Sequence, residues 1–426
     1  MYKISPLARL FSLIVTIFML TFTVGSIRFS WTLSSQLQDK PTFEKWAEDV
    51  DFLIQELPRL HTNLFFKLKK DKFLEKAARF KKSLPSFNYD EFYVGLSRLV
   101  ASVGDSHTTL RLQIKHAFPL MLYWFKEGIY VINTIPEYEK ILYGRVTAFN
   151  NRPIEEVIEA FSEIIPHENE AQIKSSIPQI MASAEHLHGL NIIPDIDKTM
   201  FTVENERGQC VSVELKSMPI RGPLKGIVDT KDATAWPLYM KNRSQFYWFE
   251  YLPSVKAIYF KYNSCRNMPH KPFSEFSKEL LDAIQNNPVD KFVIDLRNNG
   301  GGNSGILDPF IETLAKNDKM KQKGHLFVII GRQTFSSAIL NAVDLKQKTE
   351  AILIGEPTGG KPNHFGEIRF LTLPNTKLVI TYSTKYFQHA DDDTPSLMPD
   401  IPIEISIKDY KDRRDSVLNA ILAEDN

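Results

Sequence analysis

The sequence predicts a mixed α/β protein built from several domains, and three observations lead to this fold class. The chain has 426 residues, more than one compact core ordinarily encloses, so two or three domains are expected. Helical periodicity in the first quarter of the chain gives way to short β-rich runs. From about residue 245 to 408, strand and helix patterns alternate, which indicates a largely parallel sheet covered by helices.

The N-terminus predicts a signal peptide or a membrane anchor over residues 1–30. Lys3 and Arg9 precede an uncharged stretch from Leu10 to Ile27. As a helix it would be about 27 Å long, close to the roughly 30 Å of a bilayer core. The remainder of the chain is therefore expected to be extracytoplasmic, either secreted or held at the membrane by this helix if it stays uncleaved. A buried soluble helix is the alternative.

Charge and cysteine content exclude some classes of protein. A formal net charge of +1 gives no general reason to expect a nucleic acid as partner. Two cysteines, Cys210 and Cys265, cannot form a disulfide framework, although they can pair or stay free. The oligomeric state stays open.

Residues 38–116 are predicted to form a small helical domain, because EKWAEDVDFLIQEL, FLEKAARFKKSL and YDEFYVGLSRLVASV place apolar residues at three-to-four spacing. Breaks are expected at Pro58, Pro85 and Gly104.

Residues 117–220 are predicted to form a β-rich domain around two helices near 154–164 and 170–183. The segment Gly144 to Phe161 resembles the strand, turn and helix of a PDZ domain, a module that binds extended peptides by strand addition. A glycine-rich carboxylate-binding loop at its start is missing, so packing without peptide binding is the equal alternative.

Residues 221–426 are predicted to form the α/β domain, with a hairpin after its last helix. Sites in parallel sheets lie at the carboxyl ends of the strands. Three loops leave such ends, at residues 297–302, 331–336 and 356–361.

The loop VIDLRNNGGGNSG could suit a dinucleotide, since Gly300, Gly302 and Gly305 have the spacing G-x-G-x-x-G. That fingerprint needs an acidic residue at the end of the next strand. The next strand ends in Gly331 and Arg332 instead. Three consecutive glycines fit a loop that turns its amides toward an oxyanion.

A nucleophile candidate follows the next strand, where GRQTFSSA puts Ser336 and Ser337 at a helix start. A plain N-cap is the structural alternative. Free amides and the partial positive charge of a helix start would favour serine chemistry.

Two candidate bases are present. Lys361 lies on the glycine-rich turn of the third loop, and it can act as a base if its pKa is lowered. His107 in VGDSHTTL needs a smaller pKa shift to act as a base, because the ordinary pKa of histidine is already close to neutral pH. Each residue also has a non-catalytic interpretation. Lys361 could be a solvated loop lysine, and His107 could only end or cap a helix. His186 and His188 lack a third ligand, so a zinc site is not expected.

The segments DLRNNGGG, GRQTFSSA, GEPTGGK and MPDIPIEI, with GDSHT upstream, resemble the tail-specific or C-terminal processing serine peptidases and their tricorn-core relatives. Their order carries the resemblance, which spans most of residues 42–408. It implies a crotonase-like catalytic core preceded by a PDZ-like domain and a helical part.

The resemblance also implies roles for individual residues. Ser336 matches the nucleophile, and the amides of Gly301 and Ser337 match the oxyanion hole. Lys361 matches the base of the processing-protease branch, and His107 matches the base of the tricorn branch. No cofactor is implied.

Two positions depart from the family pattern. Ile339 stands where an acidic residue is often found, and Phe365 replaces a glutamine. The missing glutamine makes Lys361 the weaker candidate base and favours His107. An acidic third member could come from the aspartates at 391–393, and it stays unassigned.

The expected function is that of an extracytoplasmic serine endopeptidase acting on extended polypeptides through an acyl-enzyme on Ser336. The alternative is a catalytically silent protein that binds peptides or small ligands in the same cleft. Acyl-CoA chemistry on a crotonase-type core fits the oxyanion loop but neither the serine nor the export signal.

Overall fold

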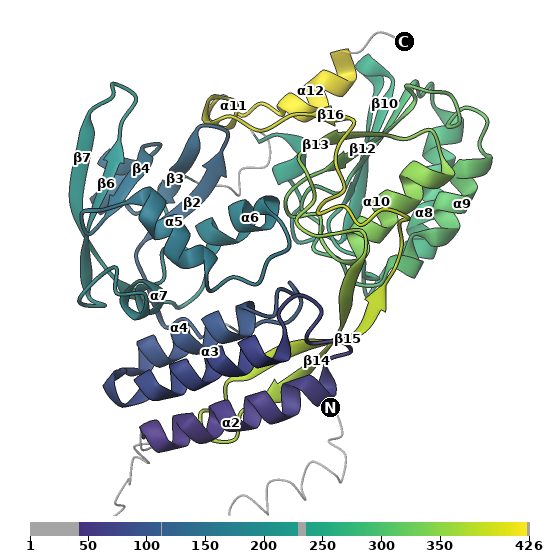
Figure 1. The fold of residues 1–426 in the computed structure, drawn as a ribbon. Coiled ribbons are helices and arrows are strands. Elements are labelled where there is room, and N and C mark those ends of the chain that lie inside the picture. The colour runs from purple at the N-terminus through teal and green to yellow at the C-terminus, as the bar shows by residue number, and fades with distance from the viewer. Residues whose placement is uncertain (1–41, 112, 229–235, 424–426) are drawn as a thin grey trace, which may run out of the picture. The chain divides into compact units, whose positions relative to one another are not determined.

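The structure, a computed structural model, describes residues 42–111, 113–228 and 236–423 (Figure 1). Pro41–Asn426 form one compact unit. The signal or anchor helix expected at residues 1–30 lies outside the described residues. Within the described ranges, no helix combines the length and the apolar character needed to cross a membrane.

The predicted helical part is present as three helices, α2 (Phe43–Leu60), α3 (Lys70–Ser83) and α4 (Tyr89–Ala101). A capping box starts α4, which explains the break before it. The break expected at Pro58 is wrong, because α2 contains this proline. The helix continues for only two residues beyond it, so the missing amide removes one hydrogen bond and the last turn survives.

The β-rich region is an antiparallel sheet in the order β2-β3-β4-β6-β7, with β5 paired to β4. Helices α5, α6 and α7 belong to the same region. The bounds are β2 (Leu120–Phe125), β3 (Gly128–Thr134), β4 (Arg145–Phe149), β5 (Arg152–Pro153), α5 (Ile154–Ser162), α6 (Glu170–Ile180), α7 (Ala184–Gly189), β6 (Lys198–Glu204) and β7 (Cys210–Lys216). The short strands β1 (His116–Ala117) and β8 (Met218–Pro219) pair at its border.

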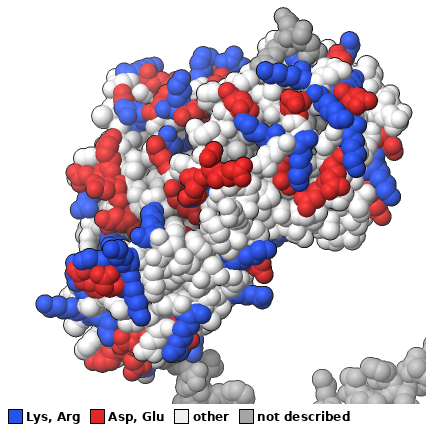
Figure 2. Space-filling view, turned by 45° about the vertical axis from the view of Figure 1, so that its right-hand side comes forward, with Lys and Arg blue, Asp and Glu red and all other residues white. Residues whose placement is uncertain are grey.

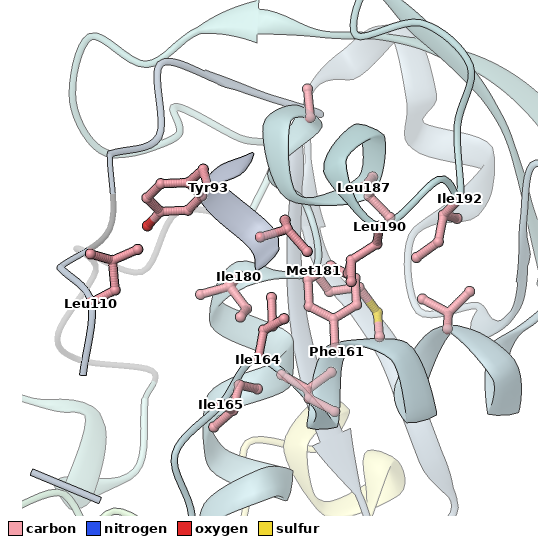
Figure 3. Packing of buried hydrophobic residues seen from close by; sticks show 14 of the residues in the cluster. Tyr93, Leu110, Phe161, Ile164, Ile165, Ile180, Met181, Leu187, Leu190 and Ile192 are labelled. Atoms are coloured by element: carbon pink, nitrogen blue, oxygen red, sulfur yellow. The ribbon is translucent and has the colours of Figure 1, made fainter. Parts of the chain in front are cut away.

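One hydrophobic core joins this region to the helical part. Tyr93 from α4, Phe161 from α5, Ile180 at the end of α6 and Leu187 from α7 all belong to this core (Figure 3). All four side chains are nearly inaccessible to solvent. Burial of aromatic and branched side chains from both regions stabilises their packing by roughly 2 kcal/mol for each large side chain.

The predicted parallel sheet has the order β16-β13-β12-β11-β10-β9, with only β9 antiparallel. Separate hydrophobic clusters cover its two faces. The bounds are β9 (Tyr247–Leu252), β10 (Ala257–Tyr262), α8 (Phe273–Asn286), β11 (Lys291–Asp295), α9 (Asp308–Lys316), β12 (Leu326–Ile330), α10 (Ser337–Lys348), β13 (Ile352–Gly355), β16 (Ile401–Pro402), α11 (Ile407–Lys411) and α12 (Ser416–Ala423). The predicted strand and helix alternation is thereby confirmed.

The hairpin of β14 (His364–Thr372) and β15 (Val379–Phe387) leaves this sheet and contacts the helical part (Figure 1). Thr109 and Thr381 exchange two backbone hydrogen bonds, of 3.2 and 2.9 Å. The carboxylate of Asp49 on α2 accepts two backbone amides from the hairpin turn, each at 2.8 Å. The hairpin therefore connects the chain around residue 107 to the parallel sheet.

Both cysteines are free, with Cys210 exposed and Cys265 buried. On the face drawn in Figure 2, basic and acidic residues are intermixed around a broad uncharged area.

A buried ion cluster supports the loop that follows β11. Arg297 donates to both carboxylate oxygens of Asp415 at 2.9 Å, and its Nε lies 2.9 Å from Asp295. Burial alone would raise the pKa of Asp295, but Arg297 and Lys261 hold it at about 2. The cluster therefore stays ionised at neutral pH and fixes the start of the glycine-rich loop.

We expect Asp415→Asn to lower the free energy of unfolding by about 3 kcal/mol, because a buried cation loses a charged partner. Urea unfolding measures the change. Asp412→Asn is the control, since its ion pair with Lys408 is exposed, and it should have little effect. Equal effects of the two variants would contradict a structural role for the cluster.

Candidate active site

The three predicted loops converge at the carboxyl ends of β11, β12 and β13, and Thr334 joins them. Its hydroxyl donates to the carbonyl of Leu296 at 2.9 Å and accepts from the amide of Gly331 at 3.0 Å. Its carbonyl accepts from the amide of Gly359 at 3.1 Å. Thr334 is completely buried, so these bonds are shielded from competing water.

Ser336 lies at the turn from β12 into α10 in a strained conformation. Its φ is +52° and its ψ is −130°, a region that costs a non-glycine residue roughly 1–3 kcal/mol. Its side chain makes no capping hydrogen bond, so the structure does not support the plain N-cap interpretation. The strained turn presents a serine at a helix start, and serine hydrolases often carry their nucleophile on such a tight strand-to-helix turn.

The glycine-rich loop packs directly against this turn. At Gly301, φ is +101°, and an added Cβ would lie 2.8 Å from Cβ of Ser336 and 3.0 Å from the Ser337 amide nitrogen. The Ser337 hydroxyl donates to the carbonyl of Gly302 at 2.8 Å. Only glycine fits position 301 at this distance from the serine.

The Gly301 amide is not free, although the family resemblance assigns it to the oxyanion hole. It donates to Oδ1 of the buried Asn299 at 2.9 Å. Within the described residues, the amides of Gly302 and Ser337 have no acceptor. Among the same residues, the amide of Gly300 likewise has no acceptor, so in this conformation Gly302 or Gly300, rather than Gly301, can supply an amide in addition to that of Ser337.

His107 is near the serine but makes no hydrogen bond to it. Its ring stacks on Phe335, the residue before Ser336, with centroids 4.5 Å apart. Both ring nitrogens are buried without a partner, which costs roughly 1–3 kcal/mol for an unsatisfied polar group. Burial lowers the pKa of His107 to about 4. The imidazole is therefore neutral at pH 7 and able to accept a proton.

Asp105 fixes the turn that carries His107. Its carboxylate accepts from the His107 amide at 2.9 Å and from the hydroxyls of Thr108 and Ser383 at 2.6 and 2.7 Å. His61 Nδ1 accepts from a backbone amide, so its Nε2 donates to Asp105 at 3.0 Å. Burial opposes ionisation, but these donors hold the pKa of Asp105 at about 2. The sequence analysis assigned Asp105 no role.

Lys361 is engaged in an ion pair. Its Nζ lies 2.6 Å from one oxygen and 2.7 Å from the other oxygen of Asp393. Its amide donates to Glu168 at 3.1 Å, and burial raises the pKa of that carboxyl group to about 7. The Lys361 ammonium group is therefore engaged by Asp393, and within the described residues it makes no hydrogen bond to Ser336.

Two further residues at the site were missed by the sequence analysis. His364 also stacks on His107, with ring centroids 5.4 Å apart, and donates from Nδ1 to the carbonyl of Lys361 at 2.8 Å. Glu168 reaches the site from the loop between α5 and α6. A histidine three positions after a candidate base was a usable signal for His364, whereas nothing in the local pattern indicated Glu168.

A cavity of about 770 Å³ is lined in part by residues of all three loops. One wall comes from β2 and α6, and the other includes Gly300, Gly331 and Phe335. In the described part of the chain, no group of three potential ligands could hold a metal ion.

We expect Gly301→Ala to reduce the reaction of Ser336 with a fluorophosphonate probe at least tenfold, because the methyl group would displace the serine. Strain at this positive φ should also lower the free energy of unfolding by about 1–3 kcal/mol. Gly300→Ala is the matched control, since a Cβ at this position meets nothing within 4 Å. Identical labelling of the two variants would contradict the proximity of Gly301 to the reactive group.

Comparisons with known proteins identify the family that the site resembles. Residues 308–403 match the model of peptidase family S41, whereas no curated protein sequence matches the chain. Mature CPAF complexed with lactacystin has a similar fold, with a TM-score of 0.61 at 14% identity over 87% of this chain and 96% of that chain. Mature CPAF gives 0.62 at 13% identity over 87% and 94%. The photosystem II D1 C-terminal processing protease gives 0.40 at 11% identity over 88% and 96%. The family match and the fold shared with CPAF confirm the resemblance of this chain to the tail-specific peptidases of family S41.

Proposed function

We propose that the protein is a serine endopeptidase that cleaves extended polypeptides outside the cytoplasm. The observation that carries the proposal is the convergence of a strained serine, a neutral histidine and unpaired amides at one edge of the parallel sheet. The family match supports peptide-bond hydrolysis. The extracytoplasmic location rests on the uncharged N-terminal stretch alone.

In the proposed reaction, Ser336 attacks the scissile carbonyl and His107 takes the hydroxyl proton. The amides of Gly302 and Ser337 hold the oxyanion. His107 then gives the proton to the leaving amine as the C–N bond breaks, and water hydrolyses the resulting acyl-enzyme. We assign His107 rather than Lys361 as base because the lysine is held in its ion pair with Asp393.

An extended polypeptide is the substrate that suits the cavity. The strand β2 is an edge of its sheet and, with α6, forms one wall of the cavity. An edge strand can pair with an added chain. A polypeptide lying along β2 would pass the glycine-rich loop and Phe335, which form the opposite wall.

A catalytically silent binding protein is the second candidate. It is favoured by two observations: His107 makes no hydrogen bond to Ser336, and the Gly301 amide is already occupied by Asn299. Labelling by a fluorophosphonate separates the two, since only an activated serine reacts.

We expect Ser336→Ala to abolish both peptide hydrolysis and labelling while thermal unfolding stays unchanged. His107→Gln should lower kcat/KM by about 10²–10⁴-fold, the usual contribution of a general base, whereas Lys361→Met should lower it far less. Because the pKa of His107 is about 4, wild-type kcat/KM should fall only as the pH drops toward 4 and the imidazole becomes protonated.

Kinetics on a quenched peptide substrate measure these effects. A Lys361→Met variant that is inactive beside an active His107→Gln variant would assign the base to the lysine. Undiminished turnover by Ser336→Ala would refute the peptidase mechanism.

A further inference from the structure

Phe335 covers one face of the candidate base. Its ring and the His107 imidazole are tilted by only 25° at a centroid distance of 4.5 Å, and His364 also stacks on His107, at 5.4 Å. Two rings therefore pack on His107 while both of its nitrogens lack partners. A productive complex requires the imidazole to leave this arrangement, because the base must reach the serine hydroxyl.

The backbone of Phe335 is fixed, whereas its side chain borders open space. Its amide donates to the carbonyl of Asn299 at 3.0 Å, and its carbonyl accepts from the amide of Ala338 at 3.1 Å. The residue is only half-buried and lines the 770 Å³ cavity. A change of rotamer can therefore move the ring without moving the backbone of Ser336.

We propose that Phe335 is a positioning residue that keeps His107 apart from Ser336 until a bulky apolar side chain of the substrate enters the cavity and displaces the Phe335 ring. The inference rests on the proposed peptidase function and adds to it a link between side-chain binding and activation of the base. Only substrates that fill the cavity would then be cut rapidly.

The geometry around His107 supports this release. Its Nδ1 lies 4.0 Å from Oδ1 of Asp105, just beyond hydrogen-bond length. A small rotation of the freed imidazole would close this gap and point Nε2 away from Asp105, toward the serine. Both unpaired nitrogens would gain partners. Asp105 and His364 are the titratable groups that influence the ring.

The apolar character of the displacing group follows from the cavity wall on β2. Leu120, Leu122 and Phe125 are buried apolar residues that line it. An apolar side chain placed there loses its contact with water, and this gain offsets the loss of the ring contact between Phe335 and His107. A small side chain would leave the Phe335 ring in place.

The test compares Phe335→Ala and the conservative Phe335→Leu with wild type and with Phe387→Ala. The control removes a ring that stacks on His364, at 5.6 Å, and leaves the turn at Ser336 unchanged. A dimethyl fluorophosphonate, too small to fill the cavity, reports the reactivity of Ser336. Histidine NMR reports the pKa of His107.

We expect Phe335→Ala to be labelled on the order of tenfold faster than wild type. Without the Phe335 ring, the state in which His107 is kept apart from Ser336 is no longer favoured. Phe335→Leu should fall between them, and Phe387→Ala should match wild type. The pKa of His107 should rise from about 4 toward its ordinary value of about 6.5 as water reaches the ring. Wild type should also prefer bulky apolar side chains in a peptide series, and Phe335→Ala should lose this preference.

Equal labelling of wild type and Phe335→Ala, or an unchanged pKa of His107, would overturn the role of Phe335 and leave the peptidase assignment intact. Absence of Ser336 labelling and of peptide hydrolysis in every variant would instead refute the proposed function, and with it the link to activation.

Discussion

The site depends on a small set of buried hydrogen bonds around Thr334. This residue joins the ends of β11, β12 and β13 through its hydroxyl and carbonyl. Phe335 adds a bond to Asn299 in the glycine-rich loop. Because the loops come from separate strands, none of them could hold the serine, the glycines and the lysine turn in register by itself. The parallel sheet gives the loops a common edge, and these bonds set the distances between them.

Conformational cost is concentrated where the proposed chemistry takes place. Ser336 has a positive φ, and His107 has two buried nitrogens without partners. Natural proteins accept such local penalties at functional sites when the surrounding structure enforces them. Here the enforcing elements are the ion cluster around Arg297 and the carboxylate of Asp105, which is held ionised by four donors.

Local sequence patterns predicted much of the fold. The alternation of strands and helices expected from about residue 245 to 408 is present, and the three loops lie at one sheet edge. Periodicity and turn residues are local signals, so they reveal elements and their ends. The helix break predicted at Pro58 was wrong, because the effect of a proline depends on how far the helix continues beyond it.

Contacts between distant segments were not predictable from the same signals. The role of Asp105 depends on His61 and Ser383, which come from opposite ends of the chain. Glu168 contacts Lys361 from the loop between α5 and α6, almost two hundred residues earlier in the chain. The Gly301 amide was assigned by family resemblance, and its partner Asn299 becomes apparent only when the loop is folded. Such pairings arise from tertiary packing, on which hydrophobic periodicity gives no information.

The β14–β15 hairpin has a further consequence for how the protein can be divided. The segment that matches the peptidase family, residues 308–403, contains Ser336 and Lys361 but lacks His107. The backbone pairing of Thr109 with Thr381 is what brings that histidine to the serine. A fragment starting at residue 221 would expose the apolar face of the hairpin to water and would lack His107. Reconstitution from two separately made halves would require this strand contact to form between chains.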